Sequence, residues 1–121
     1  MADGRQPLSY DSIENSMRDA LNRQKHLTDE YETACLSAAD SEADFKGEFA
    51  ATRMSFRDNS AGQKVTEPTA EDFATSETLE LRRQSLRDAA IRTSKKRALD
   101  TCDMQLEVLR SLMSSHRKAL E

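Results

Sequence analysis

The side chains of this chain that could do chemistry are few and scattered. His26 and His116 have no HExxH or ExxH spacing and no neighbouring cysteine that would complete a metal site. Asp40 and Asp44 share one helical face and could ligate a metal in a bundle core, but a di-iron site also needs paired Glu and His on inward faces. The sequence contains no Gly-rich phosphate loop, nucleophile elbow or ordered Ser, His and Asp set. We therefore predict no enzyme activity, no catalytic residue, no cofactor and no metal.

The two cysteines predict packing residues, not a reactive pair. Cys35 and Cys102 lie 67 residues apart, which fits neither a disulfide framework nor a CxxC site. No stretch approaches the roughly 20 apolar residues that span a bilayer, and the opening "MADGRQPLSY" lacks an apolar signal core. We therefore predict a cytoplasmic protein with no membrane partner.

The strongest charge feature is the run "IRTSKKR" at residues 91–97, in a chain whose net charge is −4. Residues 82–97 hold seven basic residues and one acidic residue, whereas residues 29–48 hold seven acidic residues and one basic residue. On a helical wheel the basic residues spread around nearly the whole circumference, and no aromatic residue lies nearby to stack on bases. We therefore predict that the acidic block neutralises the basic run and sets the pairing register.

Nucleic acid is the alternative partner of this run, and an acidic protein surface is the third. A phosphate-binding helix would lose affinity steeply as salt rises. The residues that would contact nucleic acid are Arg83, Arg87, Arg92, Lys95, Lys96 and Arg97.

Long helices must position these residues. The chain of 121 residues has three Gly and two Pro, and helix-favouring side chains dominate. Residues 1–8 predict a flexible arm, and apolar residues at steps of three, four and seven predict one helix over 9–57. The breaker cluster "DNSAGQKVTEPT" predicts a polar loop over 58–75, followed by a second helix over 76–120. We predict a single all-α domain, a long antiparallel helical hairpin of coiled-coil type that associates into a multi-helix bundle.

The charge blocks and the loop predict a register for this hairpin. Folding about a point near residue 68 sets Leu109 near Thr28 and residues 88–97 beside residues 40–49. The same register sets Cys102 near Cys35. We therefore expect these two cysteines to cross-link under oxidising conditions, since a disulfide needs Cα atoms within about 7 Å.

The second predicted helix carries more apolar surface than one partner helix can cover. Its first apolar line consists of Leu79, Leu86, Ala90, Thr93, Arg97, Thr101, Met104, Val108 and Leu112. A second line of Leu106, Leu109 and Met113 widens the apolar arc of the C-terminal half to roughly 200°. Two helices bury little surface alone, so we predict a homo-oligomer, by default a dimer, unless the N-terminal arm covers the arc. The predicted interface is Met104, Leu106, Val108, Leu109, Leu112, Met113 and His116.

Two segments, "DEYETACLSAADSEADFKGEFA" and "LRRQSLRDAAIRTSKKRALDTCDMQLEVLRSLMSSHR", resemble small two-helix proteins of phages and prophages of Gram-positive bacteria over about residues 27–118. In that class an "EYxxA…AEAxYK" segment precedes a polar loop, and the final helix ends in an "LRSxxxxxR"-like stretch. Phe45 and Lys46 stand at the aromatic-Lys position, whereas Asp44 and Gly47 depart from the pattern. The resemblance implies an accessory factor of phage DNA replication or recombination, or an inhibitor of a host protein, in the host cytoplasm.

Overall fold

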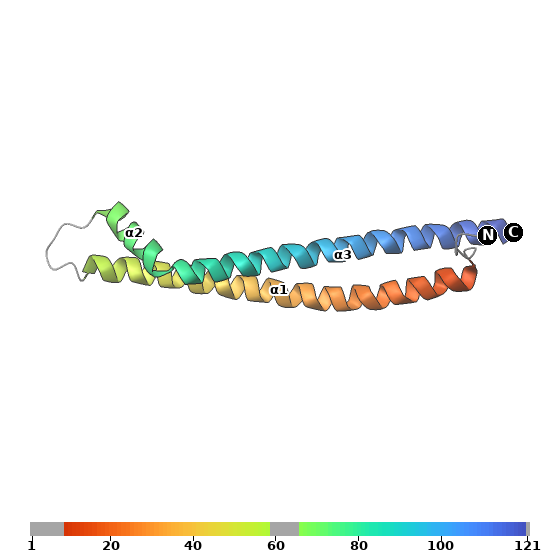
Figure 1. The fold of residues 1–121 in the computed structure, drawn as a ribbon, viewed down its shortest axis with the longest axis horizontal. Helices are drawn as coiled ribbons and strands as arrows, with labels where there is room; N and C mark the ends of the chain where they lie inside the picture. Colours follow the sequence, from red (N-terminus) through yellow and green to blue (C-terminus); the bar gives the residue numbers. More distant parts are fainter. Residues whose placement is uncertain (1–8, 59–65, 121) are drawn as a thin grey trace, which may run out of the picture. The chain divides into compact units, whose positions relative to one another are not determined.

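The structure, a computed structural model, describes residues 9–58 and 66–120. It contains three helices in these residues and no strand: α1 (Tyr10–Asp58), α2 (Glu67–Glu77) and α3 (Leu79–Leu120) (Figure 1). The prediction of an all-α fold is confirmed. The predicted N-terminal arm lies outside the described residues.

Helix α1 begins where the sequence supplies a cap and continues along a heptad-like face. The Ser9 side chain accepts a hydrogen bond from the backbone N–H of Ser12 at 3.1 Å, which satisfies one of the free donors of the first turn. The basic residue Arg57 stands in the last turn, where the helix dipole favours cations. Between the two ends, buried or half-buried side chains of α1 are spaced alternately by four and three residues, as in a coiled coil. They are Ile13, Met17, Ala20, Gln24, Leu27, Tyr31, Ala34, Ala38, Ser41 and Phe45.

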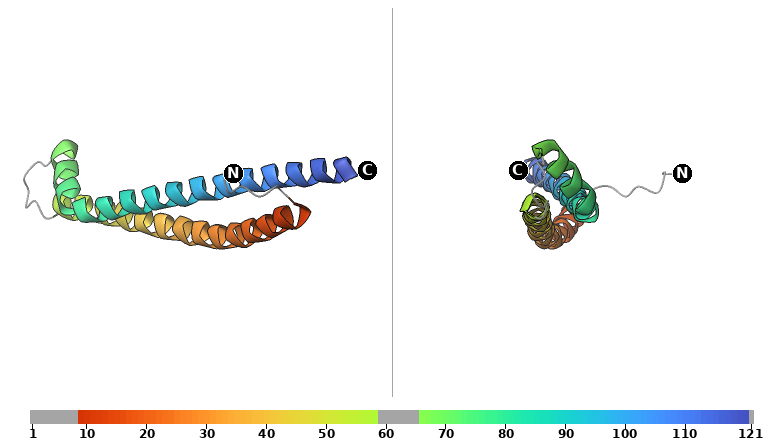
Figure 2. Two further views of the ribbon diagram at one scale, coloured as in Figure 1. Left: turned by 45° about the vertical axis from the view of Figure 1, so that its right-hand side comes forward. Right: turned by 90° about the vertical axis from the view of Figure 1, so that its left-hand side faces the viewer.

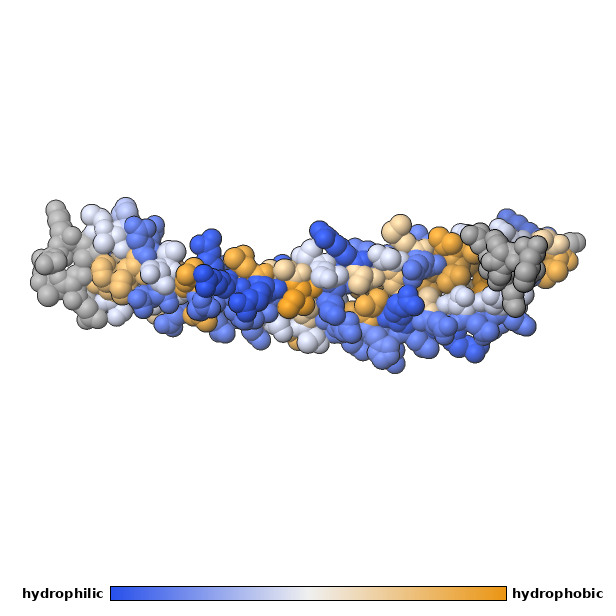
Figure 3. All heavy atoms as spheres, in the orientation of Figure 1, coloured by the Kyte–Doolittle hydropathy of each residue, from blue (hydrophilic) through white to orange (hydrophobic). Residues whose placement is uncertain are grey.

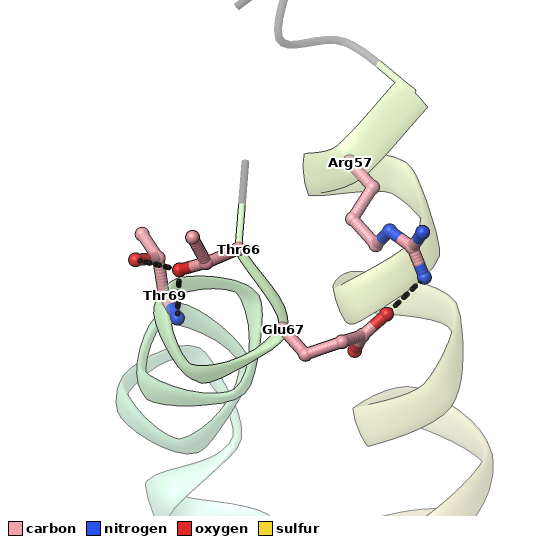
Figure 4. A network of polar contacts seen from close by, with 4 residues as sticks. All are labelled: Arg57, Thr66, Glu67 and Thr69. Atoms are coloured by element: carbon pink, nitrogen blue, oxygen red, sulfur yellow. Dashed lines mark hydrogen bonds and ion pairs between the residues drawn. The ribbon is translucent and has the colours of Figure 1, made fainter. Parts of the chain in front are cut away.

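The predicted polar loop over residues 58–75 is wrong from residue 67 onward, because these residues begin α2. Thr66 caps the helix: its hydroxyl accepts a hydrogen bond from the backbone N–H of Thr69 at 3.4 Å (Figure 4). Pro68 lies in the first turn, where a missing N–H costs no helical hydrogen bond. The proline that we interpreted as part of a breaker cluster is therefore part of a helix start.

A single residue, Thr78, separates α2 from α3. Its backbone (φ −105°, ψ 16°) lies outside helical geometry, although its N–H donates to the carbonyl of Ala74 at 3.0 Å. The backbone N–H of Arg82 in turn donates to the carbonyl of Thr78 at 3.0 Å. The chain changes direction sharply at Thr78, and α2 stands at a steep angle to the start of α3 (Figure 2).

The chain divides into two compact units. Unit 1 consists of residues up to Tyr31 together with those from Lys95 onward, and unit 2 is Glu32–Ser94. In unit 1, α1 and α3 are antiparallel. The ring of Tyr10 lies 6.0 Å from the ring of His116, whereas Glu30, farther along α1, pairs with Lys95, nearer the start of α3. In unit 2 the remaining part of α1 is antiparallel to the first half of α3, and α2 adds a third helix.

The register within each unit differs from the predicted one. In unit 1 the Gln24 side chain donates to Asp103 at 2.6 Å, whereas the prediction placed Gln24 near residue 113. In unit 2 the Ser41 hydroxyl donates to Asp88, whereas the prediction placed Ser41 near residue 96. The offset is eight to ten residues, and the predicted fold point near residue 68 lies inside helix α2.

Candidate protein-contact face

The seam of α3 in unit 1 is the second of the two predicted apolar lines. Leu106 and Cys102 are both 1% exposed, and Leu109, Met113 and His116 are half-buried beside α1. Leu106 was predicted to lie in an oligomer interface, and this assignment is wrong in the described structure because its side chain is buried within the unit. Of the half-buried residues, His116 contacts α1 through its ring, which lies 6.0 Å from that of Tyr10.

Cys102 also packs against a different residue of α1 from the one predicted. Its thiol donates to the backbone carbonyl of Ala20 at 3.3 Å, and both Cys102 and Cys35 are free thiols. The cross-link with Cys35 that we expected under oxidising conditions was based on the predicted register, which unit 1 does not follow. The prediction of a packing role fits Cys102, which fills the seam beside an alanine.

The first apolar line of α3 remains in contact with solvent. In unit 1, Met104 is 66% exposed and Val108 is 59% exposed, while Leu112 is half-buried. In the space-filling view of Figure 3, apolar side chains gather over the C-terminal half of α3. Met104 and Val108 are therefore the exposed part of the predicted interface.

Two hollows lie on either side of Met104 and Val108. The larger, of about 710 Å³, lies between α1 and α3 and is lined by Ser16, Asp19, Ala20, Arg23, Thr101, Met104, Gln105, Val108 and Leu109. The smaller, of about 400 Å³, is lined by Met104, Glu107, Val108, Ser111, Leu112 and Ser115. Because both hollows share Met104 and Val108, these side chains form a ridge between them. We call the ridge and its hollows the ridge face.

Charged residues of α1 border the ridge face. Asp19 and Arg23 are four residues apart, so both project toward the larger hollow. One nitrogen of the Arg23 guanidinium donates to the Gln105 side chain at 3.3 Å, which ties the edge of the hollow to α3. This pair was not predicted from the sequence. The sequence contained one indication of it: an acidic and a basic residue four positions apart, on either side of the seam residue Ala20.

The predicted nucleic-acid residues are dispersed among several environments. Lys95 forms an ion pair with Glu30 of α1 at 3.0 Å, which is the neutralisation that we predicted. Arg83 and Lys96 instead pair along their own helix, with Glu80 at 2.5 Å and Asp100 at 3.1 Å. Exposed Arg87 and Arg97 form no ion pair within the described parts of the chain, and neither does Arg92.

One acidic residue of the acidic block pairs along its own helix. Glu42 pairs with Lys46 at 2.8 Å, and the hydrogen bond and charge of Lys46 lower the pKa of Glu42. The charge of Arg92 lowers the same pKa further across unit 2. The predicted neutralisation between helices is therefore limited to Lys95 and, through space, Arg92.

Three further findings concern metals, membranes and relatives. Across residues 9–58 and 66–120, no three His, Cys, Asp or Glu side chains gather into a group that could hold a metal ion. None of the helices in these ranges is long and apolar enough to cross a membrane. Comparison of the chain with protein-family models, curated proteins and solved structures finds no match.

Proposed function

We propose that this protein is a non-enzymatic, self-associating helical protein that works by protein–protein contact, and that a second copy covers the ridge face of unit 1. The observation that carries the proposal is the exposure of Met104 and Val108 between two hollows. An exposed apolar ridge with a polar rim is typical of a protein-contact surface.

The small core of unit 1 supports association. Its buried apolar side chains are Ile13, Ala20, Cys102 and Leu106. A pair of helices with so few buried side chains gains little from burial, at about 25 cal/mol per Å² of apolar surface. Covering the ridge with a second copy adds apolar burial that one chain cannot supply in this unit.

The charges beside the ridge support a copy of the same chain as the partner. A two-fold axis in the contact plane, perpendicular to the helices, reverses the order of residues along both of them. Asp19 of one copy then faces Arg23 of the second copy, and Met104 faces Val108. The two pairs lie at the same height along the helices of unit 1, because Arg23 of α1 contacts Gln105 of α3. A single axis therefore satisfies the charges and the ridge together.

A charge-exchange series tests this arrangement. Asp19→Arg sets like charges together twice across the axis, so we expect the dimer to dissociate at micromolar concentration. Arg23→Asp has the same effect, and the double variant Asp19→Arg/Arg23→Asp restores the dimer. Sedimentation equilibrium measures the oligomeric state of each variant. The double variant Met104→Glu/Val108→Glu disrupts the apolar contact of the ridge in the same assay. Leu86→Glu, on the 61% exposed Leu86 of unit 2, is the matched control. A wild-type monomer, or a dimer that Asp19→Arg leaves intact, contradicts the proposal.

The biological setting that we propose is an accessory role in phage DNA replication or recombination, or inhibition of a host protein. This part is supported by the resemblance of residues 27–118 to small phage proteins. Capture of one partner by the wild type and its loss with Met104→Glu/Val108→Glu would support it. An unchanged set of captured proteins would contradict it.

Direct binding of nucleic acid is the second candidate function. It is favoured by Arg87 and Arg97, which are exposed and form no ion pair in the residues that the structure covers. Fluorescence anisotropy with single- and double-stranded DNA tests it at two salt concentrations, because phosphate contacts weaken steeply with salt. Absence of binding at about 50 mM salt removes this candidate.

A further inference from the structure

Helix α2 covers an aromatic face of α1 in unit 2. The ring of Phe73 stacks on the ring of Phe56, with centroids 4.4 Å apart and planes 19° apart. Glu67, at the start of α2, forms an ion pair with Arg57 near the end of α1 (Figure 4). On the seam of α2, Ala70 and Ala74 are fully buried. The contact therefore combines one aromatic stack, one ion pair and a close approach of small side chains.

The covered face of α1 also contains a polar atom without a partner. Phe49, Arg53 and Phe56 share one side of α1, because they are four and three residues apart. The Nε atom of Arg53 is buried and has no hydrogen-bond partner in the described structure. A buried guanidinium N–H without an acceptor disfavours the covered state relative to one in which water reaches it.

The break between α2 and α3 is not imposed by a helix-breaking residue. The segment "TSETLEL", residues 75–81, contains neither Gly nor Pro, and every residue in it is compatible with a continuous helix. The Thr78 hydroxyl donates to the carbonyl of Ala74 at 2.6 Å, a bond that bends helices. The backbone N–H of Thr78 donates to the carbonyl of Ala74, and the carbonyl of Thr78 accepts from the N–H of Arg82, as in a continuous α-helix. Release of α2 from α1 would let Thr78 adopt helical backbone angles, so that α2 and α3 form one continuous helix.

Unfilled space adjoins the same junction. A hollow of about 330 Å³ is lined by Phe45, Lys46, Phe49, Thr75 and Arg82. Thr75 and Arg82 lie three residues before and four residues after Thr78. Side chains of the described residues therefore leave one side of the pivot incompletely packed.

We infer that α2 is a removable cover that pivots at Thr78, and that the face of α1 beneath it is a helix-binding site whose external occupant is α2 of a second copy. We call this face, formed by Phe49, Arg53, Phe56 and Arg57, the covered face. The resident helix shows which chemistry fits: a glutamate in the first turn opposite Arg57, and a phenylalanine six residues later opposite Phe56. A second copy offers the same segment, and exchange of identical elements through a hinge is a common route to association. The inference concerns unit 2 and does not depend on the ridge face of unit 1.

A labelled peptide tests the covered face in the full-length protein. The probe is a fluorescein-labelled peptide with the sequence of residues 66–78, and the readout is anisotropy. In the wild type the resident α2 competes at high effective concentration, so the peptide binds weakly. Phe73→Ala in the protein removes the aromatic stack of the resident helix, and we expect the peptide to bind this variant about tenfold more tightly than the wild type.

Matched variants locate the binding. Adding Phe56→Ala to the Phe73→Ala protein removes the face itself, and a peptide carrying Phe73→Ala lacks the anchor, so both changes should abolish the gain. Glu67→Lys in the protein is a second way to release α2 at an exposed position, and it should also raise peptide affinity. Circular dichroism verifies that each variant remains helical. Equal peptide affinity for wild type, Phe73→Ala and Glu67→Lys overturns the inference, as does a gain that survives Phe56→Ala.

Discussion

Unit 1 and unit 2 are built from segments of α1 and α3, but the side chains that they bury differ in size. Unit 1 buries Ile13 and Leu106 along its seam. Among the residues that the structure describes, unit 2 buries only small side chains, those of Ala34, Ala38, Ala70, Ala74 and Thr78. Large seam residues hold two helices apart and fill the space between them, whereas small ones allow backbones to approach closely.

The two units also differ in where their larger apolar side chains lie. In unit 2, Phe56 and Phe73 stack on each other at the contact of α1 with α2. In unit 1, Met104 and Val108 stand on the exposed side of α3 and touch no third helix in the described residues. The comparison teaches that a helix pair with a narrow core requires a third element. Unit 2 contains one in its own chain, and unit 1 is the unit for which we propose a second copy.

Truncation of Leu106 gives the largest expected effect on this comparison. Leu106→Ala removes the largest fully buried side chain, so we expect a loss of about 2–5 kcal/mol in the free energy of unfolding of unit 1. Leu86→Ala in unit 2 changes a side chain that is 61% exposed and should cost at most about 0.5 kcal/mol. Urea unfolding followed by circular dichroism measures both. Equal losses would show that Leu106 does not anchor unit 1.

Enlargement of a small buried residue tests unit 2 in the opposite sense. Ala74→Leu forces a large side chain into a fully buried position between helices, so we expect a loss of about 1–3 kcal/mol through overpacking. Ala43→Leu adds the same volume at an exposed position of α1 and should leave stability nearly unchanged. Thermal unfolding of the two variants makes the comparison. A stabilised Ala74→Leu variant would mean that the contact of α2 has room for a larger side chain.

The helices themselves could be predicted from the sequence, because their signals are local. The heptad-like spacing from Ile13 to Phe45 and the absence of Gly and Pro over most of each helix predict α1 and α3 within a few residues of their ends. Helix α2 could not be predicted in the same way. Pro68 reads equally as a breaker or as a first-turn residue, and the Thr66 cap with the stack of Phe73 on Phe56 decides the matter.

The candidate site could be predicted only in part. The sequence shows two apolar lines on α3, but the tertiary contact with α1 decides which of them is buried. Hydropathy favours the line through Met104 and Val108, whereas the line that contacts α1 contains Asp88, Lys95 and Cys102. Those polar or small side chains are accommodated by partners on α1, such as Ser41 for Asp88 and Glu30 for Lys95. No periodicity in one helix reveals the partners that another helix provides.

Removal of the cap of α2 has a smaller expected effect than the core changes. Thr66→Ala deletes the hydroxyl that accepts the Thr69 N–H, so we expect α2 to lose about 1 kcal/mol of local stability. Thr66→Asp retains an acceptor and should preserve it. Amide hydrogen exchange at Thr69 reports the change directly. Unchanged exchange in Thr66→Ala would mean that the packing of α2, and not its cap, sets the protection of this turn.

The smallest expected effects come from two exposed ion pairs, one in each unit, and they fall at opposite ends of the pH scale. In unit 2, Lys46 lowers the pKa of Glu42 from its ordinary 4.5, through a hydrogen bond first and charge second. The stabilisation from Glu42 is therefore present above pH 4.5 and is lost as pH falls through the lowered pKa. In unit 1, Asp100 raises the pKa of Lys96 from 10.5, so its stabilisation is present below pH 10.5 and is lost as pH rises through the raised pKa.

Single-residue NMR titration separates these two contributions. Lys46→Met should return the carboxyl pKa of Glu42 toward its ordinary value, since it removes the largest cause of the shift. Asp100→Asn should likewise lower the ammonium pKa of Lys96 and leave the Glu42 titration unchanged, because Lys46 is the main cause of the Glu42 shift. Both pairs are solvent-exposed and screened, so moderate salt should shrink both shifts together. A Glu42 titration that Lys46→Met does not move would assign its low pKa to Arg92, and hence to the contact between α1 and α3.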